Sequence, residues 1–183
     1  MTLVTVGRQM AWETTRALRG ALAGGVAAGV WAAQQPLDKR VFGVDYDDAD
    51  LLGRFVAHGR AGYLAGLGMH LGNGALFGAL YAQVAPALPL PRVLRGPLAG
   101  LAEHLATWPA ALVVDRIPAK RPLPNLWGSW PAFAQATWRH LLFGTVLGEL
   151  ERRLNPAEPE AEPMDPGSNG HGQAEALSPL PIA

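Results

Sequence analysis

The chain has 183 residues, of which 49% are apolar and 16% are charged, whereas soluble domains carry about 25% charged residues. Fifteen Lys and Arg balance fifteen Asp and Glu, so the charge gives no reason to expect a nucleic-acid partner. The sequence contains no Cys, which excludes disulfides, thiolate metal ligands and Cys nucleophiles. The length fits a single domain.

The few charges are unevenly distributed, and they leave four long blocks with at most one charge each. A helix of about 20 apolar residues crosses the 30 Å core of a bilayer, and each block reaches that length. We therefore predict an all-α bundle of four transmembrane helices, near 17–35, 61–85, 96–115 and 131–150, within an integral membrane domain over residues 1–153. The alternative is a soluble helical bundle. The helices of soluble bundles normally keep a polar face, but residues 61–85 have no charged face.

The residues that flank these blocks favour the same interpretation. Trp12, Trp31, Trp127 and Trp130 fall near predicted helix ends, where indole rings prefer the membrane interface. Pro36 and Pro109 are expected to end the first helix and to kink the third. Seven basic residues flank the helices on each side, so the positive-inside rule gives no orientation. We expect both termini in the cytoplasm, because the acidic tail then needs no export.

The first loop predicts a short helix of its own. Asp45, Asp47 and Asp48 are suited to the N-cap and the first turn, and Asp50 and Arg54 have the spacing of a helical ion pair. Apolar residues recur on one face of this segment. We expect a short amphipathic helix at the membrane interface that leads into the second span.

The end of the chain differs from the rest in composition. Residues 154–183 are rich in Pro, Glu, Gly and Ser and poor in large apolar residues. Such a segment buries too little apolar surface to fold alone, so we predict a disordered tail.

Small residues and histidines recur at four-residue spacing in three of the predicted helices. The pattern small-x3-small-x3-His ends at His70, His104 and His140. Small residues let helix backbones approach closely within lipid, where helices have little hydrophobic drive to associate. We predict that eight glycines pack helices together: Gly62, Gly66, Gly74, Gly78, Gly96, Gly100, Gly144 and Gly148. The same faces also suit a homo-oligomer.

Five ionisable residues are expected near the middle of the membrane: His70, Glu103, His104, Arg139 and His140. Glu103 and Arg139 are the only formal charges inside the predicted spans, and each costs about 2.5–3.5 kcal/mol at a helix centre. Because pairing relieves both costs, we predict that Glu103 contacts Arg139 and that the third and fourth spans are neighbours.

Three functions stay open for this cluster. Its histidines titrate near neutral pH, which suits proton sensing or the passage of a small solute. Histidines on facing helices alternatively suit haem b or a metal ion, with Glu103 as a further ligand. The cluster alternatively only joins helices, in a structural or partner-binding bundle. The common hydrolase, phosphate-loop and dinucleotide motifs are absent, so we expect a non-enzymatic protein that needs no cofactor.

The order of these motifs resembles the YagU-like family of small bacterial inner-membrane proteins. The resemblance covers about residues 20–153 and is carried by HLGNGALFGALYAQVAP and FAQATWRHLLFGTVLGELERR. The matching positions are His70 with Phe77 and Tyr81, His104, and His140 with Glu151, Arg152 and Arg153. The resemblance implies a multi-pass protein of the bacterial inner membrane, with the lipid bilayer as its partner, and assigns no activity.

Overall fold

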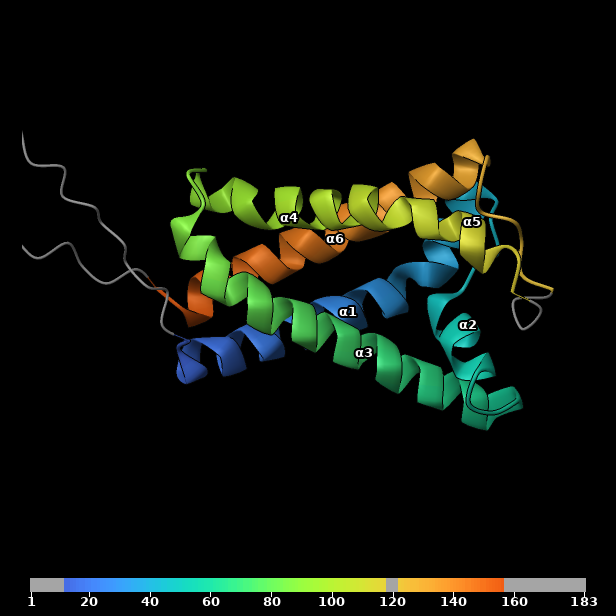
Figure 1. Ribbon diagram of the computed structural model, residues 1–183, viewed down its shortest axis with the longest axis horizontal. Coiled ribbons are helices and arrows are strands. Elements are labelled where there is room, and N and C mark those ends of the chain that lie inside the picture. Colours follow the sequence, from blue (N-terminus) through green and yellow to red (C-terminus); the bar gives the residue numbers. More distant parts are fainter. Residues whose placement is uncertain (1–11, 118–121, 157–183) are drawn as a thin grey trace, which may run out of the picture.

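The computed structural model describes residues 12–117 and 122–156, and every regular element in this part is helical (Figure 1). The elements are α1 (Thr14–Phe42), α2 (Asp48–Arg54), α3 (Gly59–Val84), η1 (Ala85–Ala87), α4 (Arg92–Thr107), η2 (Trp108–Ala110), α5 (Ala111–Val114) and α6 (Trp130–Leu154). The predicted all-α bundle is confirmed. Of the predicted tail, Leu154 belongs to α6, and residues 157–183 lie outside the described part.

Four long helices run alternately in opposite directions along one axis (Figure 1). Helix α1 packs against both α3 and α6, and α4 packs against α6, so the predicted third and fourth spans are indeed neighbours. Helix α2 packs on α3 at the end of the bundle that is remote from the start of α1. Because α3 and α4 make almost no direct contact, the bundle is open along one side.

Glycine determines how closely the helices approach. A methyl group on Gly78 would overlap the Gly20 carbonyl oxygen in α1, and one on Gly96 would overlap the Gly144 carbonyl oxygen in α6. Gly66 meets the Ala49 carbonyl oxygen of α2 in the same way. The other predicted packing glycines have similar backbone or Cβ contacts: Gly62, Gly74, Gly100, Gly144 and Gly148. All eight therefore lie where two backbone segments meet within this chain.

Side-chain size is distributed unusually between the inside and the outside. Ala is the residue type that recurs most among the buried hydrophobic residues. Leu18, Leu22, Val26 and Val30 instead form an outer stripe on α1, with exposed fractions of 66%, 60%, 46% and 37%. The exposed face of α3 likewise carries Leu, Met and Tyr side chains. The bundle therefore packs small residues inside and presents large apolar ones on its surface.

The helix boundaries correct two of the predictions. Helix α1 does not end at Pro36 but continues to Phe42, and Asp38, in the turn after the proline, is buried. The segment 96–115 is not one helix, since Pro109 converts residues 108–110 to a 3-10 turn between α4 and α5. Among the helices of the described residues, none combines the length and the apolar character needed to cross a membrane.

The first loop folds much as its sequence predicts. Gly43 ends α1 in a left-handed conformation with φ 69°, which glycine adopts at no steric cost. Asp47 is the N-cap of α2, where its carboxylate accepts a 3.0 Å hydrogen bond from the Asp50 backbone N–H. The predicted Asp50–Arg54 ion pair is present.

Candidate functional site

Three of the five predicted site residues converge where α4 faces α6. Glu103 and His104 lie on α4, and His140 lies on α6. The rings of His104 and His140 are tilted against each other with centroids 4.8 Å apart. His70, on α3, does not contact them directly. Trp31 of α1 lies between the two groups, with its ring centroid 4.7 Å from that of His140 and 5.2 Å from that of His70.

Trp31 is therefore not an interfacial tryptophan, as its position near a predicted helix end suggested. It is only 7% exposed, and its indole N–H donates a 3.2 Å hydrogen bond to Asp48. The prediction failed because α1 extends seven residues beyond position 35, which places Trp31 well inside the bundle.

The hydrogen bonds of His140 require a shared proton between its ring and Glu103. Nδ1 of His140 lies 2.7 Å from the Ala136 carbonyl oxygen, which only accepts, so Nδ1 carries a proton. Nε2 lies 2.8 Å from Oε2 of Glu103. A second proton must lie between these two atoms, either as imidazolium and carboxylate or as neutral imidazole and carboxylic acid. The pair is thus a site that holds one exchangeable proton.

His104 is held by a different chain of hydrogen bonds. The Thr137 hydroxyl donates to the Phe133 carbonyl oxygen at 2.8 Å, so its single proton is already used. Nε2 of His104 lies 3.0 Å from the same hydroxyl oxygen and must therefore donate to it. His104 is 1% exposed, and this donation fixes which ring nitrogen carries the proton.

The predicted Glu103–Arg139 pair is wrong. Arg139 donates two 2.7 Å hydrogen bonds to the carboxylate of Asp38, a bidentate arrangement, and a 3.0 Å hydrogen bond to Asp48. A fourth hydrogen bond, 3.0 Å long, goes to the Tyr46 carbonyl oxygen. The Arg139 and Asp38 side chains are 2% and 1% exposed, so this ion pair is buried. The guanidinium points away from its neighbour His140 toward the end of α1 and the start of α2.

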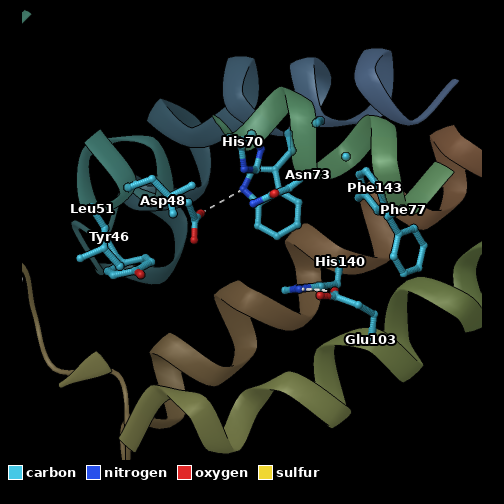
Figure 2. Close-up of a pocket in the computed structure, with 13 residues that line it drawn as sticks. Tyr46, Asp48, Leu51, His70, Asn73, Phe77, Glu103, His140 and Phe143 are labelled. Atoms are coloured by element: carbon cyan, nitrogen blue, oxygen red, sulfur yellow. Dashed lines mark hydrogen bonds and ion pairs between the residues drawn. The ribbon is translucent and has the colours of Figure 1, made fainter. Parts of the chain in front are cut away.

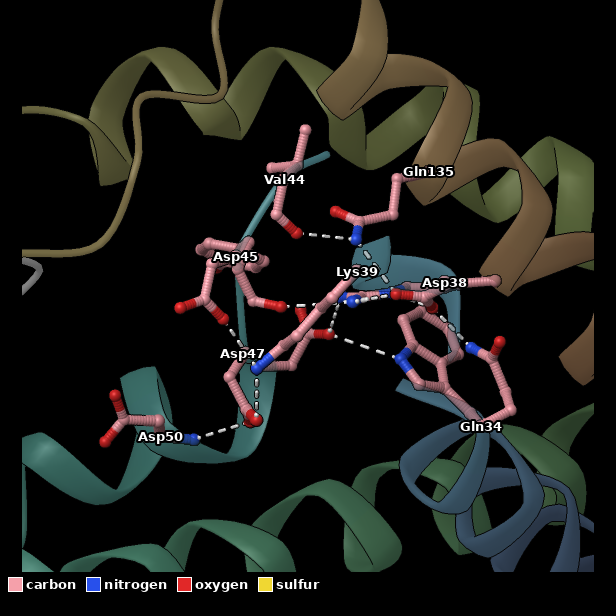
Figure 3. Close-up of polar contacts among 12 residues, drawn as sticks. Gln34, Asp38, Lys39, Val44, Asp45, Asp47, Asp50 and Gln135 are labelled. Atoms are coloured by element: carbon pink, nitrogen blue, oxygen red, sulfur yellow. Dashed lines mark hydrogen bonds and ion pairs between the residues drawn. The ribbon is translucent and has the colours of Figure 1, made fainter. Parts of the chain in front are cut away.

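A polar network surrounds this ion pair (Figure 3). Nε2 of Gln135 donates to Asp38 and to the Val44 carbonyl oxygen, both at 2.9 Å. Gln34 donates to the second Asp38 oxygen. Two carboxylates therefore share one guanidinium, Asp38 through two hydrogen bonds and Asp48 through one.

Groups at this end of the bundle have shifted pKa values. Burial raises the pKa of the Tyr46 phenol well above its ordinary value, so Tyr46 remains a neutral donor over the working pH range. Burial works to lower the pKa of Lys39, but hydrogen bonds to Asp47 and Asp45 outweigh it and raise the pKa above the ordinary value. Both carboxylates lie 3.1 Å from the Lys39 ammonium.

Two adjoining cavities meet at these groups, and Trp31, Tyr46, Asp48 and His140 line both. The first, of about 300 Å³, is drawn in Figure 2, where His70 and Asn73 lie across from His140 and Glu103. The second, of about 230 Å³, adds the Arg139 and His104 side chains. Nε2 of His70 is buried and has no hydrogen-bond partner among the described residues.

The donor geometry does not fit the haem or metal alternatives. No three His, Asp or Glu side chains within residues 12–117 and 122–156 are grouped so that they would hold a metal ion. A porphyrin between two axial histidines separates their rings, whereas His104 and His140 are in direct ring contact. We therefore derive no chemistry from a bound metal.

Sequence reasoning missed three residues of the site: Trp31, Asp38 and Asp48. Asp38 lies beyond residue 35, where the first span is predicted to end, so the prediction leaves it outside the helix. Asp48 was interpreted as a cap of α2, although Asp47 performs that role. A signal was available in Gln34, Gln35 and Asp38, because polar residues three or four apart on an otherwise apolar helix share one face.

Comparisons with known proteins assign no function to the site. Neither the protein-family models, nor the curated proteins, nor the solved structures include a match to this chain. The resemblance to the YagU-like family therefore stays a prediction, and the function must be inferred from the geometry.

Proposed function

We propose that this chain is a multi-pass membrane protein, of the bacterial inner membrane, whose central Glu103–His140 pair binds and releases a proton in response to pH. The single observation that carries the proposal is the shared proton of this pair, held beside two polar cavities within a bundle whose outside is apolar. The small-solute function predicted from the sequence uses the same cavities. The proposal includes four spans. The start of α1 and the end of α6 lie at the same end of the bundle (Figure 1), so the proposal places them on one side of the bilayer.

The surface of the bundle supports a location in lipid. A helix in water buries its Leu and Val side chains, but α1 buries Gly and Ala and leaves its Leu/Val stripe outside. That arrangement is favourable where the surroundings are themselves apolar, because small residues then provide close backbone packing. The support therefore comes from the side chains that the whole bundle presents, rather than from the hydropathy of any one helix.

The positions of the charges support the same location. The central stretch of α1, residues 20–37, and all of α3 after Arg60 are free of Lys, Arg, Asp and Glu. Toward the ends of the helices, acids and bases pair, as Arg16 does with Glu151 at 3.1 Å. Burial raises the pKa of Glu151, although Arg16 and two further arginines oppose this shift. Glu103 on α4 and Arg139 on α6 are each held by a partner on another helix, His140 and Asp38 respectively.

The absence of native Cys allows a direct test of the lipid location. We would introduce one Cys at a time, as Leu22→Cys on the outer stripe and as Arg40→Cys at the end of α1, in two residues that are both exposed. In native membranes a water-soluble maleimide should label position 40 rapidly and position 22 hardly at all. Rapid labelling at both positions would mean that water surrounds the bundle, and it would overturn the membrane part of the proposal.

The groups that face His140 come from every helix packed around it. Glu103 and His104 face it from α4, Trp31 from α1, and Asp48 of α2 lines the same cavities. His70 of α3 faces it across the first cavity. Two acids and two further histidines therefore surround the ring.

The proton function is tested by following the imidazole nitrogens of ¹⁵N-histidine-labelled protein by NMR between pH 4 and 9. The Nε2 signal of His140, assigned by its loss in His140→Gln, should change with pH as the pair gains or loses its proton, and Glu103→Gln should alter this response because the amide cannot hold the shared proton. His104→Gln, whose ring contacts His140 but takes no part in the hydrogen bond to Glu103, is the matched control and should leave the response in place. A His140 signal that does not change over this range while the protein stays folded overturns the proton function.

A further inference from the structure

The open side of the bundle contains an apolar groove that adjoins the central cavity. The groove lies between α3 and α4 and encloses about 660 Å³. Leu80 and Val84 line it from α3, and Leu98 and Ala102 line it from α4. Phe77 and Glu103 line both this groove and the 300 Å³ cavity. Phe77 and Glu103 therefore lie at the boundary between an apolar groove at the surface and a polar cavity at the centre.

The polar cavity at the centre is suited to a cation. Two acids, Asp48 and Glu103, line the central cavity, and its lining contains no Lys or Arg. Arg139 does not compensate Asp48 fully, because its guanidinium is held bidentately by Asp38. Only one Asp48 oxygen, Oδ2, accepts hydrogen bonds from described residues, namely from Arg139 and Trp31.

The aromatic lining of the cavity also fits an ammonium group. Rings of Trp31, Tyr46 and Phe143 form part of the lining, and such rings attract cations over their faces.

We propose that the cavity and the groove together bind a cationic amphiphile, with a primary ammonium head in the central cavity and a single alkyl chain in the α3–α4 groove. The cavity volume is at the lower limit for small-molecule sites, about 300 Å³, which suits a compact head group. A phosphate-bearing lipid head is unsuited, because its negative charge would face Asp48, which Arg139 compensates only in part. The inference deepens the proposed function by naming a ligand class, and it rests on that function only for the lipid exposure of the groove.

The test uses the full chain in neutral maltoside micelles at fixed pH 7, and measures the affinity of dodecylammonium from the ligand-induced rise in the unfolding temperature. Butylammonium, which has the head but a short chain, and dodecyl sulfate, which has the chain but the opposite charge, are the comparison ligands. Dodecylammonium should raise the unfolding temperature more than either. An equal effect of butylammonium overturns the role of the groove, and an equal effect of dodecyl sulfate overturns the role of the acids.

Matched variants locate the binding. Asp48→Asn should weaken dodecylammonium roughly tenfold to a hundredfold, as expected for one charged hydrogen bond, whereas Asp50→Asn, on the same helix outside the cavity, should not. Because Asp48 also contacts Arg139, Ala102→Trp provides an independent variant that fills the groove, with Leu105→Trp on the exposed surface of α4 as its control. Equal affinities within both matched pairs overturn the site.

Three results separate this inference and the proposed function from their alternatives. If Leu98→Cys forms a disulfide-linked dimer that excludes dodecylammonium, a second copy of the chain covers the groove and the ligand assignment is wrong. If dodecylammonium does not bind while the His140 signal still titrates, the ligand assignment fails and the proton function stands. If the His140 signal does not change with pH while dodecylammonium still binds, the proton function fails and the ligand assignment stands.

Discussion

The glycine contacts between α1 and α3 are tested by comparing two Gly→Ala variants whose gains in helix propensity are similar. Gly78 and Gly72 both lie in the interior of α3, so replacing either by Ala gives a similar gain in helix propensity, about 0.5–1 kcal/mol. They differ in their surroundings. A methyl group on Gly78 would meet the Gly20 carbonyl oxygen and lie 2.8 Å from the Gly24 Cα, whereas nothing lies within 4 Å of one on Gly72.

The difference between the two variants measures the helix contact. Overpacking costs typically about 1–3 kcal/mol, and here the obstacle is backbone, which cannot rotate away. For a chain of this size 1 kcal/mol changes the unfolding temperature by about 2–4 °C, so Gly78→Ala should unfold roughly 2–12 °C below Gly72→Ala. The assay is thermal unfolding followed by circular dichroism in one detergent. Equal unfolding temperatures would show that α1 and α3 do not approach at these glycines.

Three further predictions concern the polar groups. Arg139→Met leaves Asp38 buried without its cation and should cost about 3–5 kcal/mol, whereas adding Asp38→Asn should recover part of that loss; additive unfolding free energies in this cycle contradict the ion pair. Thr137→Val removes the acceptor of the His104 Nε2 proton and should cost about 1–3 kcal/mol, whereas Thr137→Ser should be nearly neutral; equal effects contradict that hydrogen bond. The raised pKa of Lys39 means that its charge stabilises the fold below pH 10.5, its ordinary value, and that this contribution is lost as the pH rises through the raised pKa. The unfolding temperature of Lys39→Met should therefore fall below that of the native chain at pH 8 and approach it at higher pH, while Arg40→Met, at an exposed neighbour, shows no such trend.

The sequence was informative about the fold because glycine and charge leave strong local signals. Four long blocks poor in charge predicted the four long helices, and the small-x3-small spacing identified backbone contacts such as Gly78 with α1 and Gly96 with α6. The cap of α2 at Asp47 was also accessible, because an N-cap depends only on neighbouring residues. These features are local, or they repeat within one helix.

The ion pairs were less accessible because they depend on the register between helices. Arg139 was expected to contact Glu103, the only other charge inside a predicted span. In the folded chain α1 continues beyond Pro36 and brings Asp38 beside Arg139, which leaves Glu103 to His140. Because α1 was predicted to end a few residues too early, the prediction paired Arg139 with Glu103 and missed the actual partner of each, Asp38 and His140.

Two neighbouring residues of α6 consequently have their partners in different parts of the bundle. Arg139 reaches toward Asp38 and the first loop, and His140 reaches toward Glu103 on α4. Trp31 contacts both groups. Its ring packs against His140, and its N–H donates to Asp48, which also accepts a hydrogen bond from Arg139. His140 and Asp48 also line one cavity. In the proposed function, a proton gained by the Glu103–His140 pair would therefore change the charge near Asp48, the first residue of α2.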